Sequence, residues 1–183
     1  LLIIGGGITG AGVARDAALR GLRVALIEAR DFASGTSSRS SKMIHGGLRY
    51  LIQGDIPVVR ESASERATLH RIAPHLAKRS NYILTAKSLT EELALRAALI
   101  AYEKLGKVAK VDHHTRWSVH RLQLEEPVLD TTGVRSAIVY PEFLTDDARL
   151  TLANVRDAAS TGAIIGNYWR AERIEKQAGI FRV

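Results

Sequence analysis

Three glycines are the first residues whose spacing indicates chemistry. Gly5, Gly7 and Gly10 form a G-x-G-x-x-G pattern that follows an apolar run at residues 1–4 and opens a segment of helical spacing. The first glycine of this pattern allows a tight turn, the second lets backbone approach a pyrophosphate, and the third lets helix and strand pack closely. The helix start offers free N–H groups to phosphates. The spacing predicts a dinucleotide site that also includes Ile8 and Thr9.

Glu28 ends a second apolar run, twenty-three residues after Gly5. A carboxylate at this offset accepts hydrogen bonds from ribose hydroxyls and repels a 2′-phosphate, so the pattern favours FAD or NAD over NADP. The alternative is a glycine-rich turn beside an ordinary solvated glutamate. Strand, turn, helix and second strand all occur in the expected order, which argues for the dinucleotide site.

A hydroxyl-rich loop follows, and its apolar flanks and basic residues argue against a disordered linker. Hydroxyls and turn-forming backbone suit the lining of an extended cofactor. The glycines after His45 would let backbone approach a flat ring. The cofactor residues expected in this region are Thr36, Ser37, Ser38, Ser41, Lys42, His45, Gly46, Gly47 and Leu48.

These residues need a βαβ unit to position them, with strands at 1–4 and 22–28 and a helix at about 10–20. Further helices are expected at 57–72, 90–105 and 146–160, and strands at 136–140 and 163–168. The end of the sequence alternates as a hairpin, at 173–176 and 180–183. Because both ends fall within expected strands, we expect the sequence to be a piece of a longer protein, inactive by itself.

Composition excludes some functions and leaves others open. The 183 residues include no cysteine, so disulfides, thiolate metal sites and a cysteine nucleophile are absent. Residues 1–110 hold seventeen Lys/Arg against nine Asp/Glu, whereas residues 111–183 hold nine against ten. The first part therefore suits an anionic partner: a cofactor, a phosphorylated substrate, an acidic membrane surface or nucleic acid.

Other polar clusters have simpler explanations than a site. The histidines lack the i, i+4 spacing of a helical metal pair, so we expect no metal site. Asp146 and Asp147 stand at a helix start, where capping explains them better than a catalytic dyad.

Residues 3–51 closely resemble the FAD-dependent glycerol-3-phosphate dehydrogenases, in the runs GGGITGAG, DFASGTSSRSSK and IHGGLRYL. Residues 146–150, DDARL, also resemble a family segment that opens a helix, whereas residues 78–87 depart most from the family pattern. The resemblance implies FAD as the cofactor, with residues 45–48 against the flavin. It also implies that Arg49 and Tyr50 bind the substrate phosphate, for which a planar guanidinium is well suited.

The resemblance implies an α/β protein with a Rossmann-like FAD-binding fold and the beginning of an α+β substrate domain. We expect the FAD domain at residues 1–60 and 146–183, and the start of the substrate domain at 61–145. The implied reaction is hydride transfer from sn-glycerol 3-phosphate to FAD, which gives dihydroxyacetone phosphate. The acid/base residues are expected beyond residue 183.

The expected partners are glycerol 3-phosphate and a quinone acceptor, with peripheral association at the inner face of the cytoplasmic membrane and a homodimer as the candidate assembly. Two rival functions stay open. One is a flavin amine or amino-acid oxidase that shares the cofactor half. The other is a non-catalytic basic module for nucleic acid or an acidic surface, which the scattered cations and the lack of a groove-reading motif disfavour.

Overall fold

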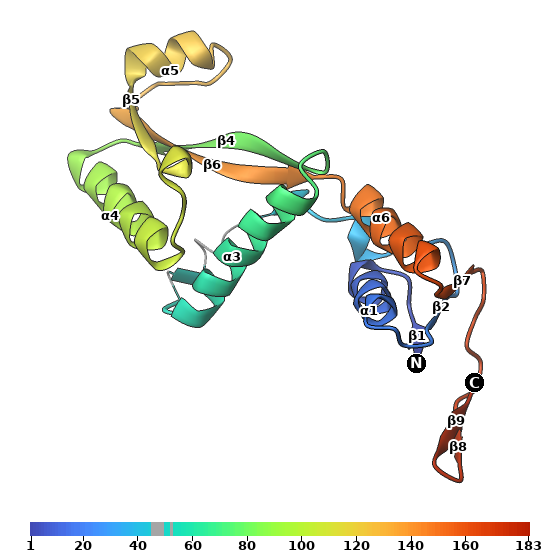
Figure 1. Cartoon of the computed structure of the whole chain (residues 1–183). Helices are drawn as coiled ribbons and strands as arrows, with labels where there is room; N and C mark the ends of the chain where they lie inside the picture. The colour runs from blue at the N-terminus through green and yellow to red at the C-terminus, as the bar shows by residue number, and fades with distance from the viewer. Residues whose placement is uncertain (45–49, 52) are drawn as a thin grey trace. The chain divides into compact units, whose positions relative to one another are not determined.

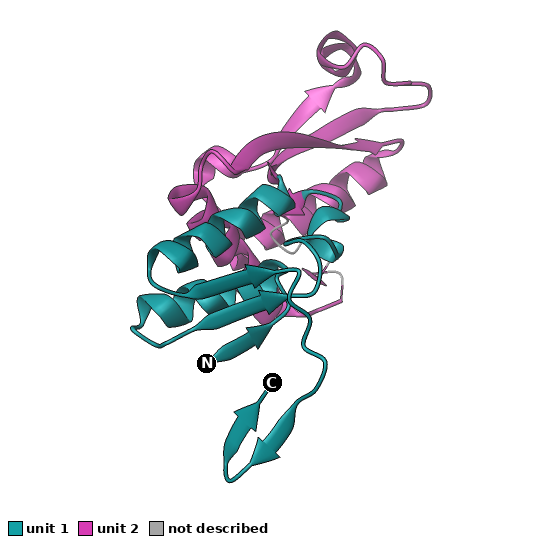
Figure 2. Ribbon diagram, turned by 90° about the vertical axis from the view of Figure 1, so that its right-hand side faces the viewer, with its two compact units in different colours: residues 1–42, 146–183 teal, residues 43–145 magenta. Residues whose placement is uncertain are grey.

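The computed structural model describes residues 1–44, 50–51 and 53–183. The chain divides into two compact units (Figure 2), one formed by residues 1–42 and 146–183 and the other by residues 43–145. The chain therefore leaves the first unit directly after the hydroxyl-rich loop and returns to it at Asp146. Each unit has its own sheet and its own apolar core.

The first unit contains a three-stranded parallel sheet in the order β1 (Leu2–Ile4), β2 (Ala25–Glu28) and β7 (Ile164–Asn167). α1 (Ile8–Leu19) connects β1 to β2, and α6 (Asp147–Ser160) leads into β7 (Figure 1). Parallel neighbours require such a crossover connection. The expected βαβ unit is confirmed, although β2 begins at residue 25 rather than 22.

Small side chains allow α1 and α6 to pack closely. Their shared core cluster consists of Ala11, Ala14, Ala17, Ala18, Val24, Leu26, Val155 and Ala158. Alanine carries nothing beyond Cβ, so the two helices can approach one another closely. Arg15 of α1 and Asp157 of α6 add an ion pair across the same contact. These contacts hold the C-terminal half of α6 against α1.

Local signals explain where α6 begins and where the terminal hairpin turns. The Asp146 side chain accepts a hydrogen bond from the backbone N–H of Arg149 at 3.1 Å, so Asp146 alone caps the helix. The hairpin joins β8 (Glu175–Gln177) to β9 (Ile180–Arg182). Ala178 and Gly179 both have positive φ, as a two-residue hairpin turn requires. The expected hairpin is confirmed.

The second unit contains an antiparallel sheet with β6 (Ser136–Thr145) at its centre. β4 (Ala77–Ala86) pairs with the whole length of β6 on one side. On the other side, β3 (Met43–Ile44) and β5 (Thr115–Ser118) pair with opposite ends of β6. Among the described residues, 140–142 of β6 have a partner strand only on the β4 side. Pro141 lies in this stretch, where a missing N–H is tolerated.

Two long helices pack against this sheet, α3 (Ile56–Ile72) and α4 (Leu89–Leu105). Their core cluster contains Val59, Leu99, Tyr102 and Ile138, and the short α5 (Val119–Glu125) completes a second cluster around Trp117 and Leu122. The helices expected at 57–72 and 90–105 each begin one residue earlier in the structure. In the part of the chain that the structure describes, no helix is long and apolar enough to span a membrane.

The sequence did not predict β3, β4, β5 or α5 of the second unit, nor the 3-10 turn η2 (Lys110–Asp112). The expected strand at 136–140 also proves to be ten residues long. β4 contains nearly all of the stretch 78–87 that departs from the family pattern, and its polar and apolar residues do not alternate cleanly. Its ten-residue pairing with β6 stabilises it as a strand, so tertiary contacts override a weak local pattern.

A buried ion pair links α3 to the sheet. Arg66 Nη1 donates to Glu142 Oε2 at 2.6 Å, and the side chains of the two residues are 4% and 1% exposed. The guanidinium also lies 5.5 Å from the centre of the Phe143 ring, within the range of a cation–π contact. A buried charge is costly unless it is paired, so these residues depend on each other.

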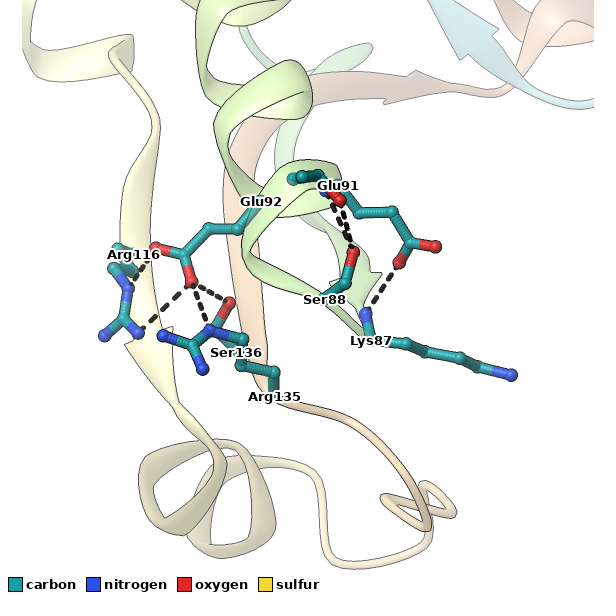
Figure 3. A network of polar contacts seen from close by, with 8 residues as sticks. Lys87, Ser88, Glu91, Glu92, Arg116, Arg135 and Ser136 are labelled. Atoms are coloured by element: carbon teal, nitrogen blue, oxygen red, sulfur yellow. Dashed lines mark hydrogen bonds and ion pairs between the residues drawn. The ribbon is translucent and has the colours of Figure 1, made fainter.

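The start of α4 carries a second network (Figure 3), centred on the buried Glu92. Arg116 of β5 donates to both carboxylate oxygens of Glu92, at 2.6 and 3.3 Å, and Ser136 Oγ of β6 donates to one of them at 2.7 Å. The hydrogen bonds from Arg116 and then Ser136 lower the pKa of Glu92 to about 2. One carboxylate therefore joins a helix to two strands.

Candidate cofactor site

The segment that follows β1 has a geometry that requires glycine at three positions, Gly5, Gly6 and Gly10. Gly5 has φ of +112°, in the left-handed region. A Cβ on Gly10 would overlap the carbonyl oxygen of Gly5, so a larger residue there would separate the helix from the turn. The central Gly6 is also required, because its Cβ would lie 2.5 Å from the Phe32 ring. The sequence pattern did not assign a role to this third glycine.

The start of α1 is open toward ligands on its Gly7 side. Gly7 is the N-cap and has no side chain to satisfy the free N–H groups of the first turn. One of these groups, the N–H of Ile8, donates instead to Ser37 Oγ at 2.9 Å. A Cβ on Gly7 would lie 3.3 Å from the same oxygen. The buried hydroxyl of Ser37 therefore closes part of the turn, and the helix dipole leaves a positive end beside it.

Glu28 is fixed at the end of β2 by two backbone donors. Its carboxylate accepts hydrogen bonds from the N–H of Gly6 at 2.7 Å and from the N–H of Arg30 at 2.8 Å. These two bonds, the one from Gly6 first, hold the pKa of Glu28 below its ordinary value. The group is therefore an anion at neutral pH with lone pairs still available as acceptors. Its proposed role toward ribose hydroxyls stays a prediction.

A cavity of about 700 Å³ lies over the glycine turn. Eight of its lining residues were expected from sequence: Gly5, Gly7, Ile8, Thr9, Gly10, Glu28, Thr36 and Ser37. The others are Ile3, Ile4, Val13, Arg30, Ser34, Gly35, Ser40 and Asp147. All of these described lining residues belong to the first unit.

Three other expected cofactor residues lie beside the cavity lining rather than in it. Ser38 Oγ donates to the carbonyl of Ala33 at 2.6 Å, Lys42 Nζ pairs with Asp147 at 3.2 Å, and Ser41 is exposed. Ser38 and Lys42 shape the loop, whereas neighbouring residues face the cavity. Sequence spacing could not separate these two groups, because the loop has no regular period.

The expected flavin and phosphate contacts fall mostly on residues 45–49, that is, His45, Gly46, Gly47, Leu48 and Arg49, which lie outside the described residues. Tyr50 is described and belongs to the second unit. Its half-buried ring packs against the cluster around Val59 and Leu99. The phosphate-binding role of Tyr50 is not tested by this packing. Among the described residues, no cluster of three metal-ligating side chains is found.

The whole chain, residues 1–183, matches the family model described as FAD dependent oxidoreductase. The chain belongs to this family. FAD is therefore its cofactor, and the expected Rossmann-like FAD-binding fold is confirmed.

Within the family, the chain is similar to the aerobic glycerol-3-phosphate dehydrogenase of Staphylococcus aureus strain USA300, with 42% identity over 174 residues. The match covers 94% of this chain but only 31% of that protein. A solved glycerol-3-phosphate dehydrogenase from Bacillus halodurans, complexed with FAD, is 32% identical and matches 98% of this chain and 28% of its own, with a TM-score of 0.69. The resemblance seen in the sequence is confirmed.

Glycine oxidase from Geobacillus kaustophilus matches 98% of this chain and 49% of its own with a TM-score of 0.76, at 23% identity. At this identity the likeness concerns the fold alone. The same fold therefore also occurs in a glycine oxidase.

The residues of the cavity fit one half of FAD, the adenosine and the pyrophosphate. A helix start without a Cβ at Gly7 offers space and N–H donors to the phosphates. The ionised Glu28 offers acceptors for the ribose. The donor set thus agrees with the cofactor of the family.

Proposed function

We propose that the full-length protein oxidises sn-glycerol 3-phosphate to dihydroxyacetone phosphate with FAD. The observation that carries this proposal is the 42% identity to the S. aureus glycerol-3-phosphate dehydrogenase over 94% of the chain. The solved relative from B. halodurans supports it at 32% identity. Because the chain spans less than a third of these relatives, the activity of the whole protein is our inference.

In this reaction the bound FAD supplies the redox chemistry by taking a hydride from C2 of the alcohol. The residues of this chain bind and orient. The first turn of α1 holds the pyrophosphate, and Glu28 holds the ribose. Arg49 and Tyr50 bind the phosphate of the substrate, with the guanidinium giving planar, two-point recognition. The residue that takes the hydroxyl proton lies beyond residue 183 in this proposal.

We further propose that the electrons pass to a quinone and that the protein associates with the inner face of the cytoplasmic membrane. Support comes from the cationic excess of residues 1–110. Membrane fractionation at low and high salt tests this part, because a peripheral, charge-driven association weakens with ionic strength. Light scattering of the purified protein tests whether it is a homodimer.

The central test is flavin reduction under anaerobic conditions. The full-length protein is expected to purify with FAD, and glycerol 3-phosphate should bleach the flavin absorbance. Glycine serves as the competing substrate, because a glycine oxidase shares the fold. Bleaching by an amino acid and not by glycerol 3-phosphate would replace our proposal with the oxidase alternative. A protein without flavin would contradict both.

A further inference from the structure

The loop at residues 34–40 supplies a large share of the cofactor cavity. Ser34, Gly35, Thr36, Ser37 and Ser40 all line it. Within this stretch the only regular element is the single turn η1 (Thr36–Ser38). A short loop of small residues loses much conformational freedom when it orders, so something outside the loop must hold it.

Two contacts on one carboxylate hold the end of the loop. Ser40 Oγ donates to Asp147 Oδ2, and Lys42 Nζ lies 3.2 Å from the same oxygen. The backbone N–H of Lys42 also donates to Ser40 Oγ, at 2.9 Å. Ser40, Lys42 and Asp147 thus form a closed cluster, which we call the loop clasp. It joins segments that are more than one hundred residues apart in the sequence.

The backbone conformation of Lys42 indicates that the end of the loop is constrained. Its φ is +63°, in the left-handed region that side-chain-bearing residues rarely adopt. Such a conformation persists where the surrounding contacts determine it. The contacts available at Lys42 are those of the loop clasp, together with a 3.4 Å hydrogen bond from its Nζ to the carbonyl of Ser38.

Asp147 is suited to be the fixed end of the loop clasp. It stands in the first turn of α6, directly after the capping residue Asp146. The helix itself is held to α1 by the alanine cluster and by Asp157. Asp147 therefore attaches the loop to the packed pair of helices α1 and α6.

The negative charge of Asp147 helps to distinguish a positioning role from a role in binding the ligand. An acid that lines a site for a pyrophosphate repels the ligand unless it is neutralised. Lys42 provides a cation 3.2 Å away. Simple electrostatics would favour a neutral residue at position 147, so a positioning role explains the acid better than a binding role.

We propose that Asp147 is a positioning residue of the FAD site, which through Ser40 and Lys42 holds the loop at residues 34–40 against the cofactor. This role concerns FAD binding alone and holds whichever substrate the enzyme oxidises. It also reassigns Lys42, which the sequence suggested as a direct cofactor contact, to the loop clasp.

The test measures FAD affinity of the full-length apoprotein by titration, followed by flavin fluorescence. Asp147→Ala is expected to weaken FAD binding on the order of tenfold, because two contacts with a charged group are lost. Asp147→Asn should lose less, about threefold, since the amide can still accept from Ser40. The deficit of Asp147→Asn should shrink at high salt, because screening weakens the half-exposed pair in the wild type. Tighter or unchanged FAD binding by these variants would overturn the proposal.

Two further variants separate positioning from other causes. The exchange Lys42→Asp with Asp147→Lys restores the opposite charges and should recover part of the affinity lost in Asp147→Lys alone. No recovery would mean that Lys42 touches FAD directly, which overturns the role of the loop clasp. Asp157→Asn is the matched control, since it removes an α1–α6 ion pair away from the cavity. An equal loss in this control would show that α6 stability, and not the loop, is responsible.

Ser40→Ala keeps the proposal testable if the charge variants fold poorly. It should weaken FAD binding about threefold with little change in melting temperature. Full FAD affinity in Ser40→Ala would contradict the role of the loop. Absence of FAD from the wild-type protein would instead contradict the proposed function, so the two failures are distinguishable.

Discussion

The hydroxyl of Ser37 accepts a hydrogen bond from the backbone N–H of Ile8, 2.9 Å away and twenty-nine residues earlier in the sequence. A residue of the hydroxyl-rich loop thus caps the helix whose start we propose to bind the cofactor. The glycine turn and the loop are therefore one structural unit. Changes in either should affect both FAD retention and the stability of α1.

Ser37→Ala is expected to lower the free energy of unfolding by about 1 kcal/mol, the usual loss for a helix-capping hydroxyl. It should also increase the rate at which FAD dissociates, because the loop is no longer tied to α1. Urea unfolding and flavin release after dilution measure the two effects. Ser41→Ala is the control, as Ser41 is exposed and outside the cavity lining. Equal behaviour of the two variants would show that the hydroxyl of Ser37 is dispensable.

Gly10→Ala should destabilise the protein by roughly 1–3 kcal/mol, because the added Cβ overlaps the carbonyl of Gly5 and forces α1 away from the turn. Gly12→Ala lies in the same helix with nothing within 4 Å of its Cβ, and should stabilise by about 0.5–1 kcal/mol. Thermal unfolding of the two variants checks the pair. Changes in stability of the same sign at both positions would contradict the close approach of Gly10 to the carbonyl of Gly5.

Glu28→Gln is expected to weaken FAD binding, because the amide offers an N–H where Gly6 and the ribose both require an acceptor. The pKa of Glu28 lies below its ordinary value near 4.5, so its contribution to stability is complete above that pH and disappears as the pH falls through the lowered value. Unfolding free energy measured from pH 7 downward should show this loss in the wild type. Glu28→Gln should lack that component, whereas the exposed Glu172→Gln should retain it.

Glu92→Gln should lower the melting temperature, because Arg116 and Ser136 lose an ionised acceptor. In the wild type, the stabilisation by the ionised Glu92 is complete above about pH 4.5. It is lost as the pH falls toward the pKa of about 2. Calorimetry across this range measures it. Arg116→Met combined with Glu92→Gln should cost less than the sum of the single changes. Strict additivity would show that the bonds between Arg116 and Glu92, drawn in Figure 3, contribute little to stability.

Arg49→Lys should raise KM for glycerol 3-phosphate by the equivalent of roughly 1–3 kcal/mol, since lysine keeps the charge but loses two-point phosphate binding. KM for unphosphorylated glycerol should change little. Steady-state kinetics of the full-length enzyme with a dye acceptor compare the two substrates. An equal effect on both would assign Arg49 to structure or to the flavin.

The sequence was sufficient for the parts of this molecule that depend on local rules. The glycine spacing, the carboxylate at the end of β2 and the helices expected at 57–72, 90–105 and 146–160 all correspond to elements that the structure contains. β4 was missed because its residues favour a strand only when β6 lies beside them. Asp147 was missed as a cavity residue because its partners, Ser40 and Lys42, are far away in sequence. Capping explained Asp147 locally, and only the tertiary structure separates it from Asp146.

The ion pair between Arg66 and Glu142 has a consequence for how this protein can change over generations. Loss of either residue alone leaves a charge in the core, which typically costs about 3–5 kcal/mol, whereas replacing both with apolar residues of matching volume is often neutral. Single substitutions at these positions should therefore be purged, and the two positions should be inherited together. Among descendants of a common ancestor, we expect either both charges or neither, and an intermediate only where a neighbouring change on α3 or β6 has first opened the pair to water.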